Sequence, residues 1–432
     1  MALANADSGR KWALPFFTLW TGQTFSLLGS QLVQFALIWW LTKTTGSATV
    51  LATASLIGLL PQVLIMPLAG ALVDRWSRRV TMIPADSVIA LATVGLAFVF
   101  WSGAVQIWQV YLLMFIRSAA GGFHWSAMQA STSLMVPQQH LSRIQGMNQM
   151  VMGGLNIISA PLGALLLEWL PIHGVLAIDV GTALLAIAPL FFIAVPQPTR
   201  AAADGALAET SVWQDFKAGF KYAASWPGLV IIGLMATMIN LLLTPAFSLL
   251  PILVTKHFNG QAFHLAWLES SWVVGVVAGG LLLSVWGGFK RRILTSMLGL
   301  LLIGMATLGI GLAPASAFTF TVGVIFLSGF ANPITNGPLF AVLQSVVEPG
   351  MQGRVFTLVG SVASAMTPLG LLIAGPVADA FGVQTWFILG GIVTMGMGVA
   401  GYFIPAVMNI EKNHANGRLP IADHPVGDRS VG

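Results

Sequence analysis

The sequence contains no cysteine, which excludes disulfides, iron–sulfur clusters and thiolate-bound metal sites. Charge is also scarce: Asp, Glu, Lys and Arg make up 8% of the residues, against about a quarter in soluble globular proteins. No Walker-type phosphate-binding loop is present, which argues against ATP as an energy source. Neither metal-ligand spacing of His and Glu nor a Ser-His-Asp order stands out. These absences argue against an ordinary soluble protein, a metal site and an enzyme.

What the sequence does contain is long apolar runs, with 56% hydrophobic residues overall. In lipid, runs of this length form helices, because a helix satisfies every backbone polar group internally. The first run follows a short polar N-terminus and lacks a small-residue cleavage site, so we interpret it as a retained span rather than a signal peptide. The expected spans are 15–41, 48–73, 80–102, 106–128, 147–170, 173–195, 228–254, 262–286, 292–313, 317–342, 354–380 and 384–408.

The nineteen Lys and Arg residues are distributed unevenly between the links. With both termini in the cytoplasm, all of them lie on the cytoplasmic side except Lys43, Lys256 and Arg117. This asymmetry follows the positive-inside rule for polytopic membrane proteins. The basic residues are therefore interpreted as topology signals, and no nucleic-acid partner is expected.

The pattern predicts an all-α membrane protein with twelve transmembrane helices in two pseudosymmetric six-helix bundles. Pro-Leu-Gly occurs at Pro161 in the fifth span and at Pro368 in the eleventh, as expected for one six-span unit repeated in the same orientation. A helix that begins at Ser211 is expected either to lie on the inner leaflet or to pack on the cytoplasmic ends of the bundle. The expected segments are 1–14, a cytoplasmic N-terminus; 15–195, the N-terminal bundle; 196–227, a linker; 228–408, the C-terminal bundle; and 409–432, a flexible cytoplasmic tail.

The link between the second and third spans combines a glycine, an acid and a cluster of arginines: Gly70, Asp74, Arg75, Arg78 and Arg79. An acid placed against helix N-termini and guanidinium groups is able to latch one conformation of a moving pair of helices. A simpler interpretation is an orientation anchor that works by positive charge alone.

Arg117 lies about halfway along the fourth span. A cation there has to face protein or water and find an acid or a carbonyl partner, since burial in lipid is expensive. The acids within spans are Asp86, Asp179 and Glu269, and each is a candidate for carrying a proton. For Asp86 we favour pairing with Arg78 and Arg79. A purely structural ion pair is the alternative interpretation for Arg117.

Four spans carry polar side chains at helical spacing, which favours a central pathway over simple hydrogen bonding between helices. The candidate cavity residues are Gln23, Ser30 and Gln34 in the first span, Gly121 and His124 in the fourth, Thr237, Asn240 and Thr244 in the seventh, and Asn332 and Asn336 in the tenth. Aromatic residues and Met nearby suit a bulky amphipathic ligand.

The charged link resembles the signature of the major facilitator superfamily, with Ser77 at its second glycine position. The chain as a whole is similar to drug:proton antiporters of the macrolide-efflux branch, most densely around Gly29 and Ser30, Thr45 to Thr49, and Gln352 to Phe356. The second half has Ser284 in place of the link's Asp, so the latch is expected in the first half. The antiporter motif of the fifth span is matched only in part, by Pro161 and Gly163.

This resemblance implies a secondary exporter that works by alternating access on the proton gradient, without a cofactor. Arg117 would tune the protonation of a nearby acid, and spans one, four, seven and ten would line the cavity. The expected partners are membrane lipid, protons and a small amphipathic substrate, and the expected state is a monomer in the bacterial inner membrane. The branch also includes siderophore exporters and lysophospholipid transporters, and a non-transporting receptor or scaffold remains an alternative.

Overall fold

The computed structural model describes residues 12–73, 77–193, 217 and 220–411, and this part of the chain is helical with no strand. The N-terminal half contains α2 (Ala13–Thr45), α3 (Ala48–Val73), α4 (Arg78–Trp101), α5 (Ile107–Met135), α6 (Gln138–Trp169) and α7 (Ile172–Phe192). The C-terminal half contains α9 (Pro227–Ser248), α11 (Ala262–Trp286), α12 (Arg292–Leu312), α13 (Phe318–Val346), α14 (Pro349–Phe381) and α15 (Val383–Phe403). Short helical turns follow α9 and α15: α10 (Leu250–Ile252) with η1 (Leu253–His257), and α16 (Pro405–Met408).

Eleven of these helices are long and apolar enough to cross a bilayer. The twelfth long helix is α5, which has 29 residues but no equally long apolar stretch, because Arg117, His124 and several Ser and Gln side chains interrupt it. A helix of that length spans the hydrocarbon core, and its polar residues require neighbours that are not lipid. The predicted all-α membrane fold is confirmed, and the helix that departs from the apolar pattern is the one that carries Arg117 about halfway along its length.

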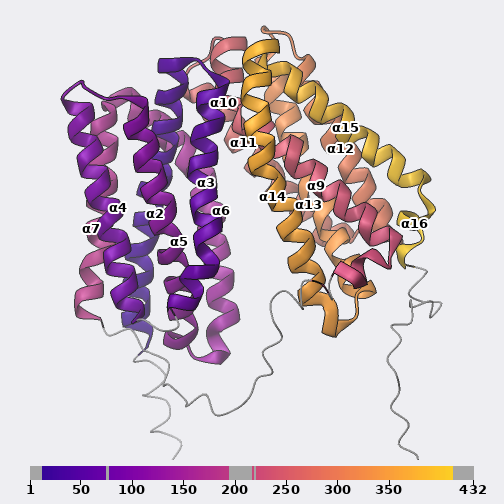
Figure 1. The fold of residues 1–432 in the computed structure, drawn as a ribbon, viewed down its shortest axis with the longest axis horizontal. Helices are drawn as coiled ribbons and strands as arrows, with labels where there is room; N and C mark the ends of the chain where they lie inside the picture. The colour runs from indigo at the N-terminus through magenta and orange to yellow at the C-terminus, as the bar shows by residue number, and fades with distance from the viewer. Residues whose placement is uncertain (1–11, 74–76, 194–216, 218–219, 412–432) are drawn as a thin grey trace, which may run out of the picture.

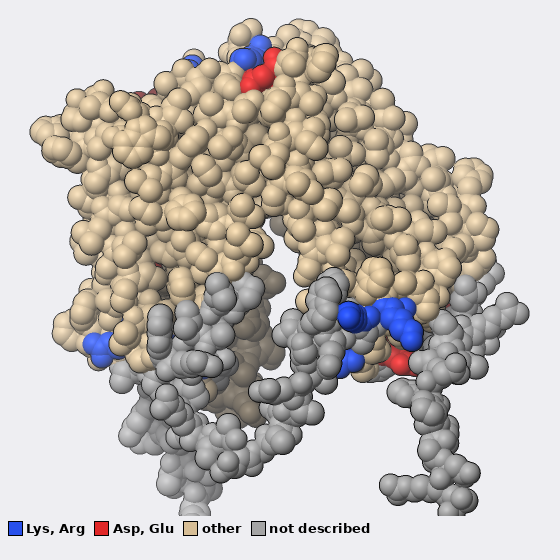
Figure 2. Space-filling view, viewed as in Figure 1, with Lys and Arg blue, Asp and Glu red and all other residues tan. Residues whose placement is uncertain are grey.

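The two halves stand side by side and lean toward each other at one end (Figure 1). We call this the closed end; it carries the α2–α3 and α4–α5 connections and α10. At the opposite end, which we call the open end, the halves diverge and leave a hollow between them (Figure 2). The molecule is therefore closed at one end of its helices and open at the other.

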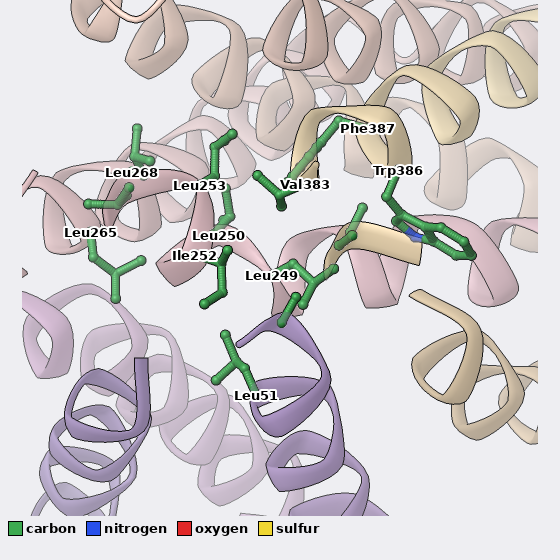
Figure 3. Close-up of a cluster of buried hydrophobic side chains, with 14 of the residues drawn as sticks. Leu51, Leu249, Leu250, Ile252, Leu253, Leu265, Leu268, Val383, Trp386 and Phe387 are labelled. Carbon is green, nitrogen blue, oxygen red and sulfur yellow. The ribbon is translucent and has the colours of Figure 1, made fainter. Parts of the chain in front are cut away.

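An apolar cluster joins the halves at the closed end. Leu51 of α3 packs in one cluster with Leu249, Leu250 and Ile252 around α10, and all four side chains are buried (Figure 3). Trp386 of α15 belongs to the same cluster and donates from its indole nitrogen to the carbonyl of Leu242 at 2.9 Å. Burial of apolar side chains from both halves excludes water from this end.

Toward the open end, each half has its own apolar cores. One cluster contains only residues of the C-terminal half, such as Trp226, Met297 and Val346. The clusters around Leu19 and Phe16 contain only residues of the N-terminal half. Exposed basic side chains, among them Lys290, Arg291, Arg292 and Arg354, lie at this end of the C-terminal half, where Figure 2 shows a basic patch.

The predicted helix of the linker falls mostly outside the described residues. Residues 217 and 220–224 are helical, and Trp226 precedes α9 with a buried side chain. Its placement on the membrane surface stays a prediction.

Candidate functional site

A cavity of about 580 Å³ lies inside the N-terminal half. Its wall comes from α2, α3, α4, α5, α6 and α7, and it is mostly polar on the side of α2 and α5. Of the residues singled out from the sequence, Gln23, Ser30, Gln34, Asp86, Arg117, Gly121, His124 and Asp179 line it. The polar stripes of the first and fourth spans therefore face one space rather than lipid.

Arg117 pairs with Asp179 across this cavity. Its guanidinium Nη1 lies 2.5 Å from Oδ2 of Asp179, and the two side chains are 11% and 2% exposed. Nη1 also donates to the hydroxyl of Thr93 on α4 at 2.9 Å, and the hydroxyl of Ser30 on α2 donates to Oδ1 of Asp179 at 3.4 Å. Four helices thus contribute to one charged cluster, and the arrangement compensates both charges inside the membrane.

Gly29 allows α2 to approach this cluster closely. A Cβ atom at this position would overlap the Thr182 hydroxyl and lie 3.0 Å from Oδ1 of Asp179. We expect Gly29→Ala to displace α7 and to lower the free energy of unfolding by about 1–3 kcal/mol. Thermal unfolding of the purified protein measures this loss. Gly121→Ala is the matched control, because a Cβ there meets no atom within 4 Å; equal losses in both variants would contradict the explanation.

Asp86 forms a second pair in the same cavity. Nδ1 of His124 lies 2.8 Å from Oδ1 of Asp86, and the amide of Gln23 donates to Oδ2 at 3.3 Å. Both partners are about nine-tenths buried. His124 lies seven residues beyond Arg117 on α5, which places this pair about 10 Å closer to the open end.

The prediction that Asp86 pairs with Arg78 and Arg79 is wrong. Arg78 donates to the carbonyl of Ala130 on α5 and Arg79 to the carbonyl of Phe191 on α7, each at 2.6 Å. Phe191 lies in the last turn of α7, where an unpaired carbonyl and the helix dipole favour a cation, whereas Ala130 lies five residues before the end of α5. Both arginines thus bond to backbone carbonyls near the ends of α5 and α7, and Asp86 faces the cavity instead.

A second cavity, of about 610 Å³, lies in the C-terminal half beside the first. Of the predicted residues, Thr244, Glu269, Asn332 and Asn336 line it, with Trp272 and Phe247 among the aromatic neighbours. Gln31 of α2 lines both cavities, and Asn156 and Ser159 of α6 extend into the second one. The polar surfaces of the two halves therefore meet at the boundary between them.

Glu269 is the acid of this second cavity. It projects from α11 and is partly buried, and among the described residues it makes no hydrogen bond or ion pair. Its neighbour Ser270 reaches across the boundary toward the carbonyl of Ile157 on α6 at 3.5 Å. A carboxyl group in this position is available to a proton or to a cationic ligand.

Two predicted cavity residues take part in helix packing instead. Thr237 is buried and donates to the carbonyl of Gly233 within α9. Asn240 donates to the carbonyl of Ala236, and its own side-chain oxygen accepts from Thr367 on α14 at 3.4 Å. For these two residues the alternative interpretation, hydrogen bonding within and between helices, describes the geometry.

The predicted latch is only partly within the described residues. Asp74 and Arg75 lie outside them, and Gly70 is in the last turns of α3. Arg78 and Arg79 begin α4, with the contacts given above. The role of the latch in the transport cycle stays a prediction.

Several site residues were missed by the sequence reasoning. Thr93 contacts the charged cluster from α4, and Gln62 and Ser118 line the first cavity from α3 and α5, where the backbone N–H of Gln62 donates to the hydroxyl of Ser118 at 3.1 Å. Single hydroxyl or amide side chains in apolar spans are weak signals, because such residues commonly bond to their own helix. No group of three or more His, Asp or Glu suited to a metal ion occurs among the described residues.

Two pseudosymmetric six-helix bundles, with adjoining cavities that carry polar side chains and a charged pair inside the membrane, define a membrane transporter rather than an enzyme. The sequence profile described as Major Facilitator Superfamily matches residues 19–371. The chain belongs to this family, as the charged link and the repeat had indicated.

Relatives extend over nearly the whole chain. Macrolide efflux protein A of Streptococcus pyogenes is 33% identical over 401 residues, which cover 93% of this chain and 98% of that protein. Multidrug efflux pump Tap of Mycobacterium bovis is 25% identical over 431 residues, with coverage of 95% and 96%. Among solved structures, a bacterial homologue of the human lysosomal transporter Spinster, in an inward-facing and unoccupied conformation, superposes with a TM-score of 0.67 at 14% identity, covering 94% of this chain and 98% of that one. This last likeness concerns the fold alone.

Proposed function

We propose that this chain is a proton-coupled exporter of amphipathic drugs that works by alternating access. The single observation that carries the proposal is the Arg117–Asp179 pair, a buried cation and acid on the wall of a 580 Å³ cavity. Drug-sized ligands occupy pockets of about 300–1,000 Å³. The relatives named for macrolide and multidrug efflux support drugs as the substrate class.

The lining of both cavities suits a bulky ligand with few directional contacts. Met66, Met114 and Met152 contribute flexible thioethers to the first cavity, and Trp272 and Phe247 contribute rings to the second. Such surfaces repack around ligands of different shape. Amide groups such as those of Gln34 and Asn336 are among the side chains that supply polar contacts.

The open end faces the cytoplasm in this proposal. Basic residues lie at that end in both halves, and the closed end carries only Lys43 and Lys256 among the described Lys and Arg residues. Both termini then lie in the cytoplasm of a bacterial cell, and the protein sits in the inner membrane as a monomer. The cavities open toward the side from which an exporter collects its substrate.

The proton gradient supplies the energy in this scheme, without a cofactor. Protonation of Asp179 releases it from Arg117, and the freed guanidinium then alters the helix contacts of the N-terminal half. Asp86 and Glu269 are the further candidate proton sites. In the opposite conformation, Asp74 with Arg75, Arg78 and Arg79 would latch the cytoplasmic ends of the helices.

Expression in an efflux-deficient bacterial host tests the proposed function. We expect raised resistance to amphipathic drugs, macrolides among them, and lower accumulation of a fluorescent drug. A proton uncoupler is expected to abolish both effects, and an empty vector is the control. No change in susceptibility across the panel, with normal membrane insertion, would contradict drug export; siderophore or lysophospholipid export by the same cells would then identify the substrate class.

A further inference from the structure

Asp379 links the two halves at the closed end. It lies in the last turn of α14, in the C-terminal half, and its carboxylate reaches the first turn of α3 in the N-terminal half. Oδ1 accepts from the backbone N–H of Ala48 at 2.8 Å. Oδ2 accepts from the backbone N–H of Thr49 at 2.9 Å and from the hydroxyl of Ser47 at 2.8 Å. One side chain thus makes three hydrogen bonds to the other half.

The carboxylate of Asp379 completes the N-terminal cap of α3. The first N–H groups of a helix have no partner within it, and they favour a negative charge. Ser47 caps part of this turn from its own half, since its hydroxyl accepts from Val50 at 3.3 Å. The N–H groups of Ala48 and Thr49 are satisfied from the opposite half, by an ionised carboxylate that strengthens each bond.

Gly375 provides a second, independent contact at the same place. It lies one turn before Asp379 on the same face of α14. A Cβ atom at Gly375 would lie 2.7 Å from the Cα of Thr49 and 3.0 Å from the Cβ of Ala52. The backbones of α3 and α14 therefore pack closely here, with only the Ala52 methyl group between them.

We propose that Asp379 and Gly375 form an interdomain clasp that holds the closed end shut and sets the balance between the two conformations of the transport cycle. The clasp has to break before the closed end opens, because α3 and α14 belong to different halves. Breaking it leaves three donors and a carboxylate to water on an exposed surface, so the clasp is reversible. This inference rests on the alternating access of the proposed function and is independent of drug or proton identity.

Pulsed electron–electron double resonance tests the clasp by measuring the distance between two spin labels. The natural chain has no cysteine, so labels attach only where cysteine is introduced. Ser102→Cys and Ser316→Cys place labels on exposed connections of the closed end, one in each half. The distance distribution is recorded on purified protein without drug and without a pH gradient. In the doubly labelled protein with Asp379 and Gly375 unchanged, we expect short distances between the labels to dominate.

Asp379→Ala is expected to raise the ratio of long to short distances by roughly tenfold, since it removes a charged cap and its hydrogen bonds. Asp379→Asn should give a smaller increase, because its oxygen still accepts and only the charge is lost. Gly375→Ala should shift the distribution in the same direction by steric separation of α3 and α14. Glu168→Gln is the matched control, because Glu168 is an exposed acid of α6 at the closed end of the molecule. We expect no shift of the distance distribution in this variant.

An unchanged distance distribution in both Asp379 variants, with monodisperse protein on size exclusion, would overturn the clasp. If the Asp379 variants fail to fold, the Gly375→Ala distribution decides, and the absence of a longer-distance population there overturns it as well. A negative drug panel with a positive distance shift would reject drug export and retain the clasp. The two proposals therefore fail separately.

Discussion

Replacing Arg117 with alanine abolishes proton-driven drug export and destabilises the N-terminal half: this is the largest effect we expect. The substitution leaves Asp179, which is 2% exposed, without its counter-charge. Removing one partner of a buried ion pair lowers the free energy of unfolding by about 3–5 kcal/mol. Protonation of Asp179 would recover part of the lost free energy of unfolding. It would also leave no carboxylate at this position to exchange protons with the gradient. Drug accumulation in cells and thermal unfolding of purified protein measure the two consequences.

A double variant separates the structural role of the pair from its role in coupling. Arg117→Met with Asp179→Leu removes both charges and fills the space with apolar side chains, so we expect it to recover most of the stability lost in Arg117→Ala. Export should remain at background in the double variant, since no titrating pair is left. Full export by a normally inserted Arg117→Ala protein would contradict the coupling role, and recovered export in the double variant would show that the pair is structural.

Glu269→Gln gives the second large effect: we expect loss of gradient-driven export with little change in stability. Glutamine has nearly the same shape, and Glu269 makes no hydrogen bond or ion pair with other described residues that the change would break. In proteoliposomes with an imposed pH gradient, uphill drug transport should fall to background. Exchange of drug without a gradient should persist, because the cavity keeps its volume and its aromatic wall.

The exposed acid Glu168 provides the control for this change. Glu168→Gln removes one carboxylate outside both cavities, and we expect wild-type export from it. Selective loss of cationic drugs in Glu269→Gln, with neutral drugs still driven by the gradient, would show that Glu269 recognises the ligand's charge and carries no proton. Wild-type uphill transport of every drug would exclude Glu269 from both roles.

The fold could be predicted from the sequence to a large extent. Hydrophobic length specified the long helices, and the repeated Pro161 and Pro368 segments specified two equivalent halves. The spans agree with the helices because a membrane admits few alternatives for an apolar run. The long helix α5 is not among the eleven sufficiently apolar helices, and the sequence already indicated its different character through Arg117.

The site was predictable only in part. Helical spacing placed Gln23, Ser30 and Gln34 on one face, and these residues do line a cavity. The same reasoning placed Thr237 and Asn240 on a cavity face, whereas they bond within α9 and to α14. Periodicity gives the relative orientation of residues on one helix, but the rotation of that helix against its neighbours depends on packing over the whole bundle.

The sequence by itself determined that this protein crosses the membrane many times in two similar halves, and that Arg117 requires a partner, since unpaired charge and unbonded backbone are both too costly in lipid. Only the tertiary structure decided that the partner is Asp179, that Asp86 faces His124 rather than Arg78, and that Asp379 caps a helix of the opposite half. These pairings join residues from 38 to 331 positions apart, as the Asp86–His124 and Ala48–Asp379 contacts show. Hydropathy and spacing act along one segment, whereas such contacts arise from how separate helices pack, which no local pattern records.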